Sequence, residues 1–270
     1  MLCKLMYKHI KYTKSIKLKA SSSKALSNRL NVNKKYSKKD LSKWLFQKYK
    51  IKKNFKILEV GAGLGQHVIK ESKIVGRKGF ILAVDNSSKS LSYIKSKKLK
   101  NVETFCIEMD ELPLFIEKKK ILFDRILTSY SIYYANNPIL LIRKLISFLS
   151  PNGEIIITVP NTPHTLVEMI NSKSKIPSNV TQSLYFGKKI LKPYLLKNYK
   201  NIKTFDFKNE LKLKNFEDLY NLYASSTFFI KKKEKIIKKS LYNSFQISFK
   251  KKRHFKLKKS ALMIIIKNKY

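Results

Sequence analysis

One segment restricts the possible folds of this chain more than any other: an apolar strand that runs directly into three alternating glycines. In ILEVGAGLGQH, residues 57–67, the glycines are Gly61, Gly63 and Gly65, and helical periodicity follows at once. Alternate glycines permit a tight turn and let a ligand lie against the backbone. The helix that follows offers unpaired N–H groups at its positive end. The segment therefore predicts a ligand-binding loop between a strand and a helix of an α/β sheet.

The spacing and charge of this loop distinguish it from a pyrophosphate-binding loop. Dinucleotide enzymes use G-x-G-x-x-G to hold a pyrophosphate, whereas this chain has G-x-G-x-G with Glu59 just before it. The carboxylate would repel a pyrophosphate, but it suits a ligand that carries an ammonium or sulfonium group. Asp85 ends the next predicted strand, where a carboxylate can accept hydrogen bonds from both hydroxyls of a ribose. An Asp at that position can instead cap the following helix.

Strands and helices alternate along the chain on both sides of this loop. At this spacing, right-handed crossovers bring the strands into a parallel sheet that is buried on both faces. After Pro160 the pattern is less regular, with two further strands and a lysine-rich helical stretch. The predicted strands are 56–60, 79–84, 102–107, 123–129, 154–159, 203–209 and 254–267, and the main predicted helices are 64–75, 87–98, 137–149 and 215–250.

These patterns divide the chain into three parts. Residues 1–33 form a basic tail that we expect to be flexible, residues 34–160 a ligand-binding core with an N-terminal helix, and residues 161–270 a substrate-covering region with the last strands. Residues 1–39 contain twelve Lys or Arg, six Ser and no acidic residue, as organellar targeting segments do. No apolar run approaches the ~20 residues that span a bilayer. We expect a cytoplasmic protein, with targeting to an organelle as the alternative.

Several motifs occur in an order that is typical of one enzyme family. ILEVGAGLGQH is followed by AVDNS (83–87), CIEMDELP (106–113), FDRILTSYSIYY (123–134) and LSPNGEIIITVP (149–160). This order resembles the class I S-adenosylmethionine-dependent methyltransferases, nearest the group that includes ubiquinone-pathway and other small-molecule methyltransferases. The resemblance covers about residues 55–160. It implies a Rossmann-like α/β fold: a seven-stranded, mostly parallel sheet with a reversed last strand, helices on both faces and a helical lid in the C-terminal part.

The resemblance also implies that S-adenosylmethionine is the cofactor. Glu59 would lie near the methionine amino group, Asp85 would hold the ribose hydroxyls, and Asn86 would lie against the adenine. Glu108 would meet the adenine amino group, although Asp110 is an alternative two residues away. The implied cofactor-binding residues are Glu59, Gly61, Ala62, Gly63, Gly65, Asp85, Asn86, Glu108, Met109 and Ser129, where Met109 would pack on the adenine ring or simply in the core.

Substrate residues are expected after the fourth and fifth strands, because ligands of open α/β sheets bind at the carboxyl ends of the strands. Aromatic residues of 161–200 and 210–253 are expected to cover them. No catalytic residue is predicted, since methyl transfer from a sulfonium needs little acid–base chemistry. The four histidines lack metal-ligand spacing, so no metal is expected, and Cys106 is predicted to be buried in its apolar strand. The predicted pocket residues are Tyr130, Tyr133, Tyr134, Asn161, His164, Tyr220 and Tyr223.

The charge of the chain leaves the class of acceptor open. The net charge is +42, and the flanks carry most of it, +16 in residues 1–55 and +20 in residues 161–270. Only five of the 59 basic residues are Arg, so a lysine-rich composition explains much of this excess. We expect methyl transfer to a small acceptor, and the lysines favour an anionic one. The alternatives are an RNA or DNA methyltransferase that uses the basic flanks, and a non-catalytic cofactor-binding protein.

Overall fold

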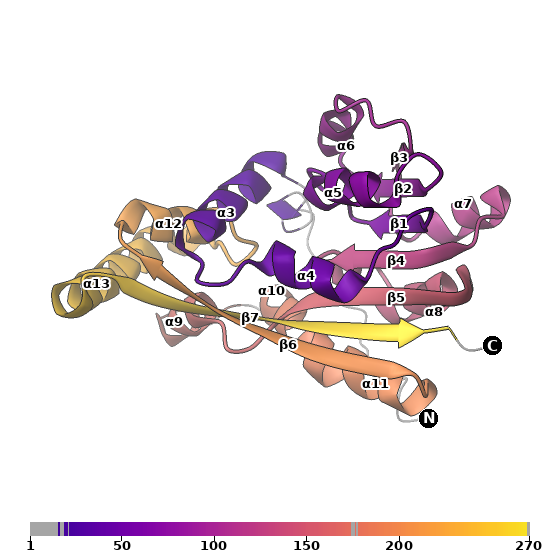
Figure 1. Cartoon of the computed structure of the whole chain (residues 1–270). Coiled ribbons are helices and arrows are strands. Elements are labelled where there is room, and N and C mark those ends of the chain that lie inside the picture. The colour runs from indigo at the N-terminus through magenta and orange to yellow at the C-terminus, as the bar shows by residue number, and fades with distance from the viewer. Residues whose placement is uncertain (1–15, 17–18, 21, 174–175, 177, 269–270) are drawn as a thin grey trace.

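The fold is built on a single twisted sheet. A computed structural model describes residues 16, 19–20, 22–173, 176 and 178–268 (Figure 1). Seven strands lie in the order β3-β2-β1-β4-β5-β7-β6; β1 to β5 are parallel, and β7 is antiparallel to both β5 and β6. This confirms the predicted fold class, including the reversed last strand. The strands are β1 (Lys56–Val60), β2 (Phe80–Asp85), β3 (Val102–Cys106), β4 (Phe123–Ser129), β5 (Leu149–Asn161), β6 (Ile202–Leu213) and β7 (Phe255–Lys267).

Helices cover both faces of the sheet, because its central strands are apolar on both sides. Buried side chains of α4, α5 and α6 pack on one face, and those of α7, α8 and the helices after β5 pack on the other. The helices are α3 (Ser23–Tyr36), α4 (Leu41–Tyr49), α5 (Gln66–Val75), α6 (Ser88–Lys95), α7 (Leu112–Lys119), α8 (Pro138–Ile146), α9 (Thr165–Lys173), α10 (Ser178–Tyr185), α11 (Lys192–Asn198), α12 (Phe216–Ala224) and α13 (Glu234–Lys252), with short turns η1 (Ile132–Tyr134), η2 (Phe186–Leu191) and η3 (Lys231–Lys233).

The edge strand β3 is less buried than its sequence predicts. Cys106 is exposed, so the prediction that it is a buried apolar residue is wrong. The reason is the position of β3 at one end of the sheet order, where a strand has a neighbour on one side alone. Phe105 is also 44% exposed, with its ring against that of Phe115.

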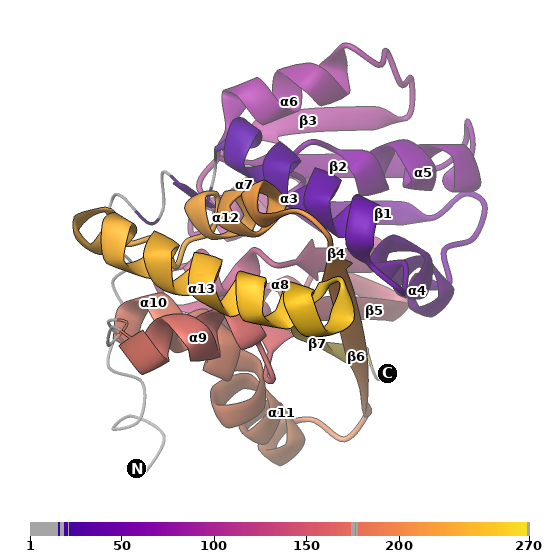
Figure 2. The ribbon, with the colours of Figure 1, turned by 90° about the vertical axis from the view of Figure 1, so that its left-hand side faces the viewer.

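The segment predicted as a flexible tail is in part a packed helix. α3 begins at Ser23, and its N-cap Ser22 accepts a hydrogen bond from the backbone of Ala25. Ala25 and Val32 are buried, because α3 lies against α12 (Figure 2). The predicted boundary after residue 33 therefore falls inside a helix. Residues 1–15 of that tail lie outside the described residues.

The chain between β6 and β7 lies at the end of the sheet that carries the glycine loop. Leu213, which ends β6, pairs with Phe255 at the start of β7, beyond the pair of Asn161 and Ser260 at the carboxyl end of β5. α12 and α13 therefore project from the carboxyl ends of the parallel strands (Figure 1). This position is the one expected of a cover over a ligand; the cover itself stays a prediction. Among the helices of the described residues, none has the length and apolar character to cross a membrane.

Candidate functional site

The glycine loop joins β1 to α5 and is held by its neighbour β2. The backbone nitrogens of Gly61 and Ala62 both donate to the carbonyl of Val84, at 2.9 Å each. Gly61, Gly63 and Gly65 have φ angles of +77°, +53° and +68°, which L side chains rarely adopt. Three alternating glycines are therefore required by the backbone path of the loop.

Two of these glycines are also required by packing. A Cβ at Gly61 would overlap the side chain of Ser131, and one at Gly65 would overlap Ile94. A Cβ at Gly63 would lie 3.1 Å from Leu26 of α3. From the sequence, the three glycines are explained by the tight turn and the approach of a ligand. The structure adds a further reason, because neighbouring side chains occupy the space that a Cβ would need.

Asp85 is fixed at the rim of this loop. Its carboxylate accepts hydrogen bonds from the backbone nitrogens of Gly63, at 2.8 Å, and Ser87, at 2.9 Å. Burial raises the pKa of Asp85, while these two hydrogen bonds oppose the rise. The carboxylate thus orders the glycine loop and the start of α6 at the same time.

A second polar pair lies beside Asp85. Asn86 Nδ2 donates to Glu108 Oε1 at 3.1 Å, which brings together two residues assigned to the adenine. The alternative, Asp110, instead accepts hydrogen bonds of 3.0 and 3.1 Å from the backbone nitrogen of Asn136. Met109 is partly buried and packs against the core. Both carboxylates therefore have a hydrogen-bond partner, and the assignment of Glu108 to the adenine stays a prediction.

Glu59 is buried on the face of the sheet that α4 and α5 cover. It is 2% exposed, its Oε2 has no hydrogen-bond partner among the described residues, and His67 Nδ1 lies 3.9 Å from its Oε1. Burial, together with the neighbouring Glu71, raises the pKa of Glu59 well above its usual range. Burial lowers the pKa of His67 to about 4, so this histidine is neutral. A cation next to Glu59 would stabilise its charged form.

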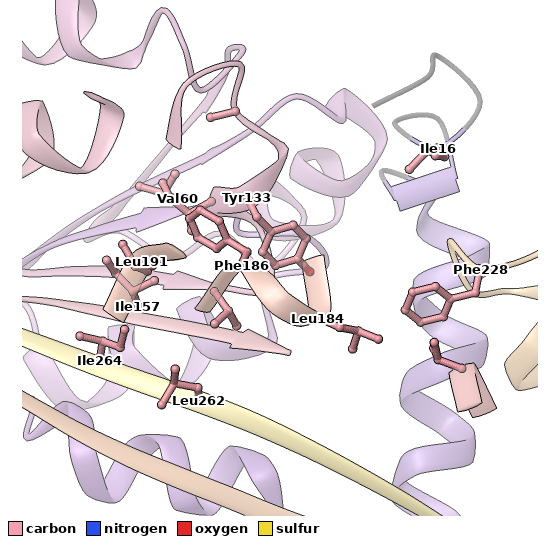
Figure 3. Close-up of a cluster of buried hydrophobic side chains, with 14 of the residues drawn as sticks. Ile16, Val60, Tyr133, Ile157, Leu184, Phe186, Leu191, Phe228, Leu262 and Ile264 are labelled. Carbon is pink, nitrogen blue, oxygen red and sulfur yellow. The ribbon is translucent and has the colours of Figure 1, made fainter. Parts of the chain in front are cut away.

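The residues assigned to the end of β4 have different environments. Ser129 Oγ and the hydroxyl of Tyr49 lie 2.9 Å apart, a contact that sequence analysis missed. Tyr130 has a φ of +58° and is 36% exposed, which suits the wall of a site. Tyr133 is 6% exposed and lies in the cluster of Figure 3, with its ring 6.4 Å from that of Phe186.

Asn161 ends β5 and His164 follows it, and the two residues differ in role. Asn161 is buried and donates to Asp206 Oδ1 at 3.1 Å, so it ties β5 to β6. His164 lies edge-on to Phe228, and its buried Nδ1 has no hydrogen-bond partner among the described residues. Burial, and then Lys259, lower the pKa of His164 to about 3. The histidine is therefore neutral but too weakly basic to accept a proton readily.

The two tyrosines of α12 differ in exposure, since Tyr220 is partly exposed and Tyr223 is buried. Tyr223 has no exposed surface, and its hydroxyl accepts a hydrogen bond from the backbone nitrogen of Ile230 at 3.2 Å. Tyr220 donates a hydrogen bond to Glu234 of α13, and the ammonium of Lys238 lies 4.3 Å from the centre of its ring. The assignment of Tyr223 to a substrate pocket is wrong because the residue belongs to the core.

Sequence analysis also missed residues that support the loop from a distance. Ser131 Oγ donates to the carbonyl of Val60 at 2.7 Å and lies 2.8 Å from Thr128 Oγ1. Its role depends on a contact across strands, which no local motif indicates. Among the described residues, no group of three His, Cys, Asp or Glu side chains could hold a metal ion.

The sequence matches a family model along the same segment. A model described as a methyltransferase domain matches residues 51–198, more than half of the chain. The chain belongs to this methyltransferase domain family. Its sheet order and glycine loop make it a class I, S-adenosylmethionine-dependent type of methyltransferase domain. A comparison with curated proteins finds no significant match.

Solved structures share the fold of this methyltransferase domain. The YcgJ protein of Bacillus subtilis has a TM-score of 0.57 at 15% identity, over 85% of this chain and 98% of its own. The cyclase SpnF has a TM-score of 0.53 at 14% identity, over 87% of each chain. The plantazolicin methyltransferase BpumL, in complex with a triazolic desmethylPZN analog and SAH, has a TM-score of 0.51 at 15% identity, over 95% of this chain and 98% of its own. At these identities the likeness shows the fold alone.

Proposed function

We propose that this protein binds S-adenosylmethionine and transfers its methyl group to a small acceptor. The observation that carries the proposal is the Asp85 carboxylate, which Gly63 of the glycine loop holds at the carboxyl end of β2. Each Asp85 oxygen accepts one backbone hydrogen bond and keeps a further acceptor position for a ribose hydroxyl.

The other residues of the site fit a cationic nucleoside. Glu59 has an oxygen without a partner among the described residues, and a methionine ammonium near the loop would supply one. Asn86 and Glu108, already hydrogen-bonded to each other, offer polar groups for the adenine. The G-x-G-x-G spacing and the acidic Glu59 just before the loop disfavour a pyrophosphate and therefore a dinucleotide.

The residues of this chain have mainly a positioning role in the proposed reaction. S-adenosylmethionine would supply a methyl group already activated on a sulfonium. The chain must then hold the acceptor in line with that group and exclude water. Tyr130, which is exposed at the carboxyl end of β4, would contact the acceptor, and α12 and α13 would cover it. The pKa of His164, about 3, argues against a strong general base at this site.

The experiment that tests methyl transfer uses the full-length protein with methyl-labelled S-adenosylmethionine and a library of small hydroxyl, amine and carboxylate compounds. We expect label in at least one product, identified by mass spectrometry, and none after heat denaturation. Binding of SAH, the demethylated form of the cofactor, without any labelled product would support the non-catalytic alternative. The fold alone does not decide the reaction, because the cyclase SpnF has the same fold and is named for another reaction.

An RNA substrate is the second alternative, and the surface of α13 is the observation that favours it. A shallow surface there is lined by Lys235, Lys238 and Lys239 together with Phe216, Tyr242 and one acidic residue, Glu217. Basic and aromatic side chains in this combination can bind single-stranded RNA. We expect unspecific RNA binding that weakens steeply with salt, as phosphate contacts release counterions. Sequence-selective methylation of an RNA at physiological salt would contradict the small-acceptor proposal.

A further inference from the structure

Two cationic residues, Arg29 of α3 and Lys259 of β7, are linked through the side chain of Asn33 at the carboxyl end of the sheet. Lys259 of β7 donates to Asn33 Oδ1 at 3.0 Å, and Asn33 Nδ2 donates to the carbonyl of Arg29 at 2.7 Å. The guanidinium of Arg29 donates to the carbonyl of Ser225, where α12 ends. Both side chains are partly buried, and Arg29 lowers the pKa of Lys259, so the two positive charges lie within electrostatic range.

No Asp or Glu neutralises this pair. All acidic residues of the chain lie in its described part, and none is in ion-pair contact with Arg29 or Lys259. Most acidic residues of the surrounding elements have other partners. Asp218 of α12 binds Lys35 and Tyr36, and Glu234 of α13 binds Lys231 and Tyr220. Asp206 and Glu210 of β6 bind Asn161 and the pair of Lys38 and Lys256, respectively, and Glu168 of α9 accepts from the backbone of His164. Glu217 of α12 is exposed.

Another arginine of the chain shows what a compensated charge looks like in this fold. Arg125 is 7% exposed, donates to the carbonyl of Tyr49 at 2.9 Å, and has Glu154 at 3.3 Å. Desolvated charges without a counter-charge are costly. Among the described residues, the hydrogen-bond partners of the Arg29 and Lys259 side chains are a neutral carbonyl and a neutral amide, so an anion would complete their environment.

The surroundings of the pair match the expected position of an acceptor. Tyr134, at the carboxyl end of β4, lies within electrostatic range of Arg29, and His164, after β5, within that of Lys259. Leu26 lies one turn before Arg29 on α3, and its Cδ2 would be 3.1 Å from a Cβ added at Gly63 of the glycine loop. Three residues of helix advance about 4.5 Å along its axis, so α3 extends from the loop to the cationic pair.

We propose that Arg29 and Lys259 form an oxyanion site that binds a carboxylate or phosphate group of the methyl acceptor. A guanidinium can hold such a group through two parallel hydrogen bonds, and an ammonium adds a third. Tyr134 and His164 are neutral, so they do not neutralise the positive charges of Arg29 and Lys259, which can both interact with the ligand. That the bound group belongs to the methyl acceptor rests on the proposed function. The oxyanion site itself rests on the contacts of Arg29 and Lys259.

The test measures binding of benzoate and phenyl phosphate to the full-length protein, with and without saturating SAH, by calorimetry at constant ionic strength. We expect millimolar or tighter binding of at least one compound. Arg29→Gln and Lys259→Gln should each weaken it at least about tenfold, because each removes a charge-assisted contact. Arg29→Lys should lose less, since it keeps the charge. Lys24→Gln, an exposed position on the same helix, is the matched control and should bind as wild type.

A second measurement needs no variant and therefore does not depend on folding of the mutants. Burial and Arg29 lower the pKa of Lys259 to about 8, so acetic anhydride should acetylate it readily near that pH. Benzoate or phenyl phosphate should slow this acetylation and leave that of Lys24 unchanged. Mass spectrometry of tryptic peptides gives both rates.

Three results would overturn the inference. One is that neither compound binds or slows acetylation of Lys259, and another is that both Gln variants bind like wild type. The third is that a single-stranded RNA protects Lys259 while the small oxyanions do not, which would assign the pair to RNA phosphates. Oxyanion binding without any SAH binding would support the site and contradict the proposed function, so the two failures are distinguishable.

Discussion

The carboxylate of Asp85 accepts a hydrogen bond from the backbone nitrogen of Gly63 at 2.8 Å, which ties the end of β2 to the middle of the glycine loop. Asp85→Ala removes this contact and the expected partner of the ribose. We predict that SAH affinity falls roughly 10- to 150-fold, measured by calorimetry. Glu103→Ala, on the exposed edge strand β3, is the control and should bind SAH normally. Unchanged affinity in Asp85→Ala would remove Asp85 from the site.

The glycines of the loop should differ in how much they tolerate a side chain. Gly61→Ala places a Cβ against Ser131 at a φ of +77°, whereas Gly63→Ala meets a flexible end of Leu26 at 3.1 Å. A left-handed backbone costs an L residue roughly 1–2 kcal/mol in both variants, and the overlap adds to the cost in Gly61→Ala alone. We predict a lower melting temperature for Gly61→Ala than for Gly63→Ala. Equal melting temperatures would contradict the packing role of Ser131.

Glu71 should make the stability of the protein depend on pH. It is fully buried, neither carboxylate oxygen has a partner among the described residues, and burial raises its pKa to about 8. The folded state therefore keeps the proton up to about pH 8, while the unfolded chain loses it near its ordinary pKa of 4.5. The stability that the protonated form of Glu71 contributes is fully present below pH 4.5, and it is lost as the pH rises toward 8.

The variant Glu71→Gln tests this dependence. It cannot ionise, so we predict that it melts at a higher temperature than wild type at pH 8 and that the difference shrinks toward pH 5. Each kcal/mol corresponds to about 2–4 °C in large domains. Thermal melts followed by circular dichroism at several pH values give the comparison. Parallel curves for the two proteins would show that Glu71 has an ordinary pKa.

Tyr130 and Tyr223 should have opposite phenotypes. Tyr130 is 36% exposed, so Tyr130→Ala should impair turnover while SAH affinity changes by less than about threefold, or under 1 kcal/mol. Tyr223 is fully buried, and Tyr223→Ala should cost roughly 3–5 kcal/mol of stability, as other large core truncations do. Melting temperatures and initial rates separate the two. A stable Tyr223→Ala variant with reduced turnover would restore Tyr223 to the substrate site.

The sequence predicts the sheet and the glycine loop well because their signals are local. Glu59, Gly61 and Asp85 belong to short strand-end motifs, and the structure places them around one loop. The helical part of the predicted tail could not be recognised in the same way. Most of α3 is polar, and its buried residues Ala25 and Val32 are seven positions apart. Contacts with distant elements, which no local pattern encodes, bury them.

The same limit applies to the acceptor side. Lys259 and Asn33 are 226 positions apart, so their hydrogen bond has no sequence signature. Arg29 had a weak signal, as one of five arginines in a chain that uses lysine almost everywhere else. Tyr223 was misassigned because an aromatic residue on a lysine-rich helix has the same pattern whether it faces a ligand or the core.

The central claim is that the glycine loop binds S-adenosylmethionine, and calorimetric titration of the wild-type full-length protein tests it most directly. The titrants are SAH and, in a separate experiment, NAD. We predict a single class of SAH sites with micromolar or tighter affinity and no binding of NAD, because the glycine spacing and Glu59 disfavour a pyrophosphate. Tight binding of NAD together with no binding of SAH would contradict the account.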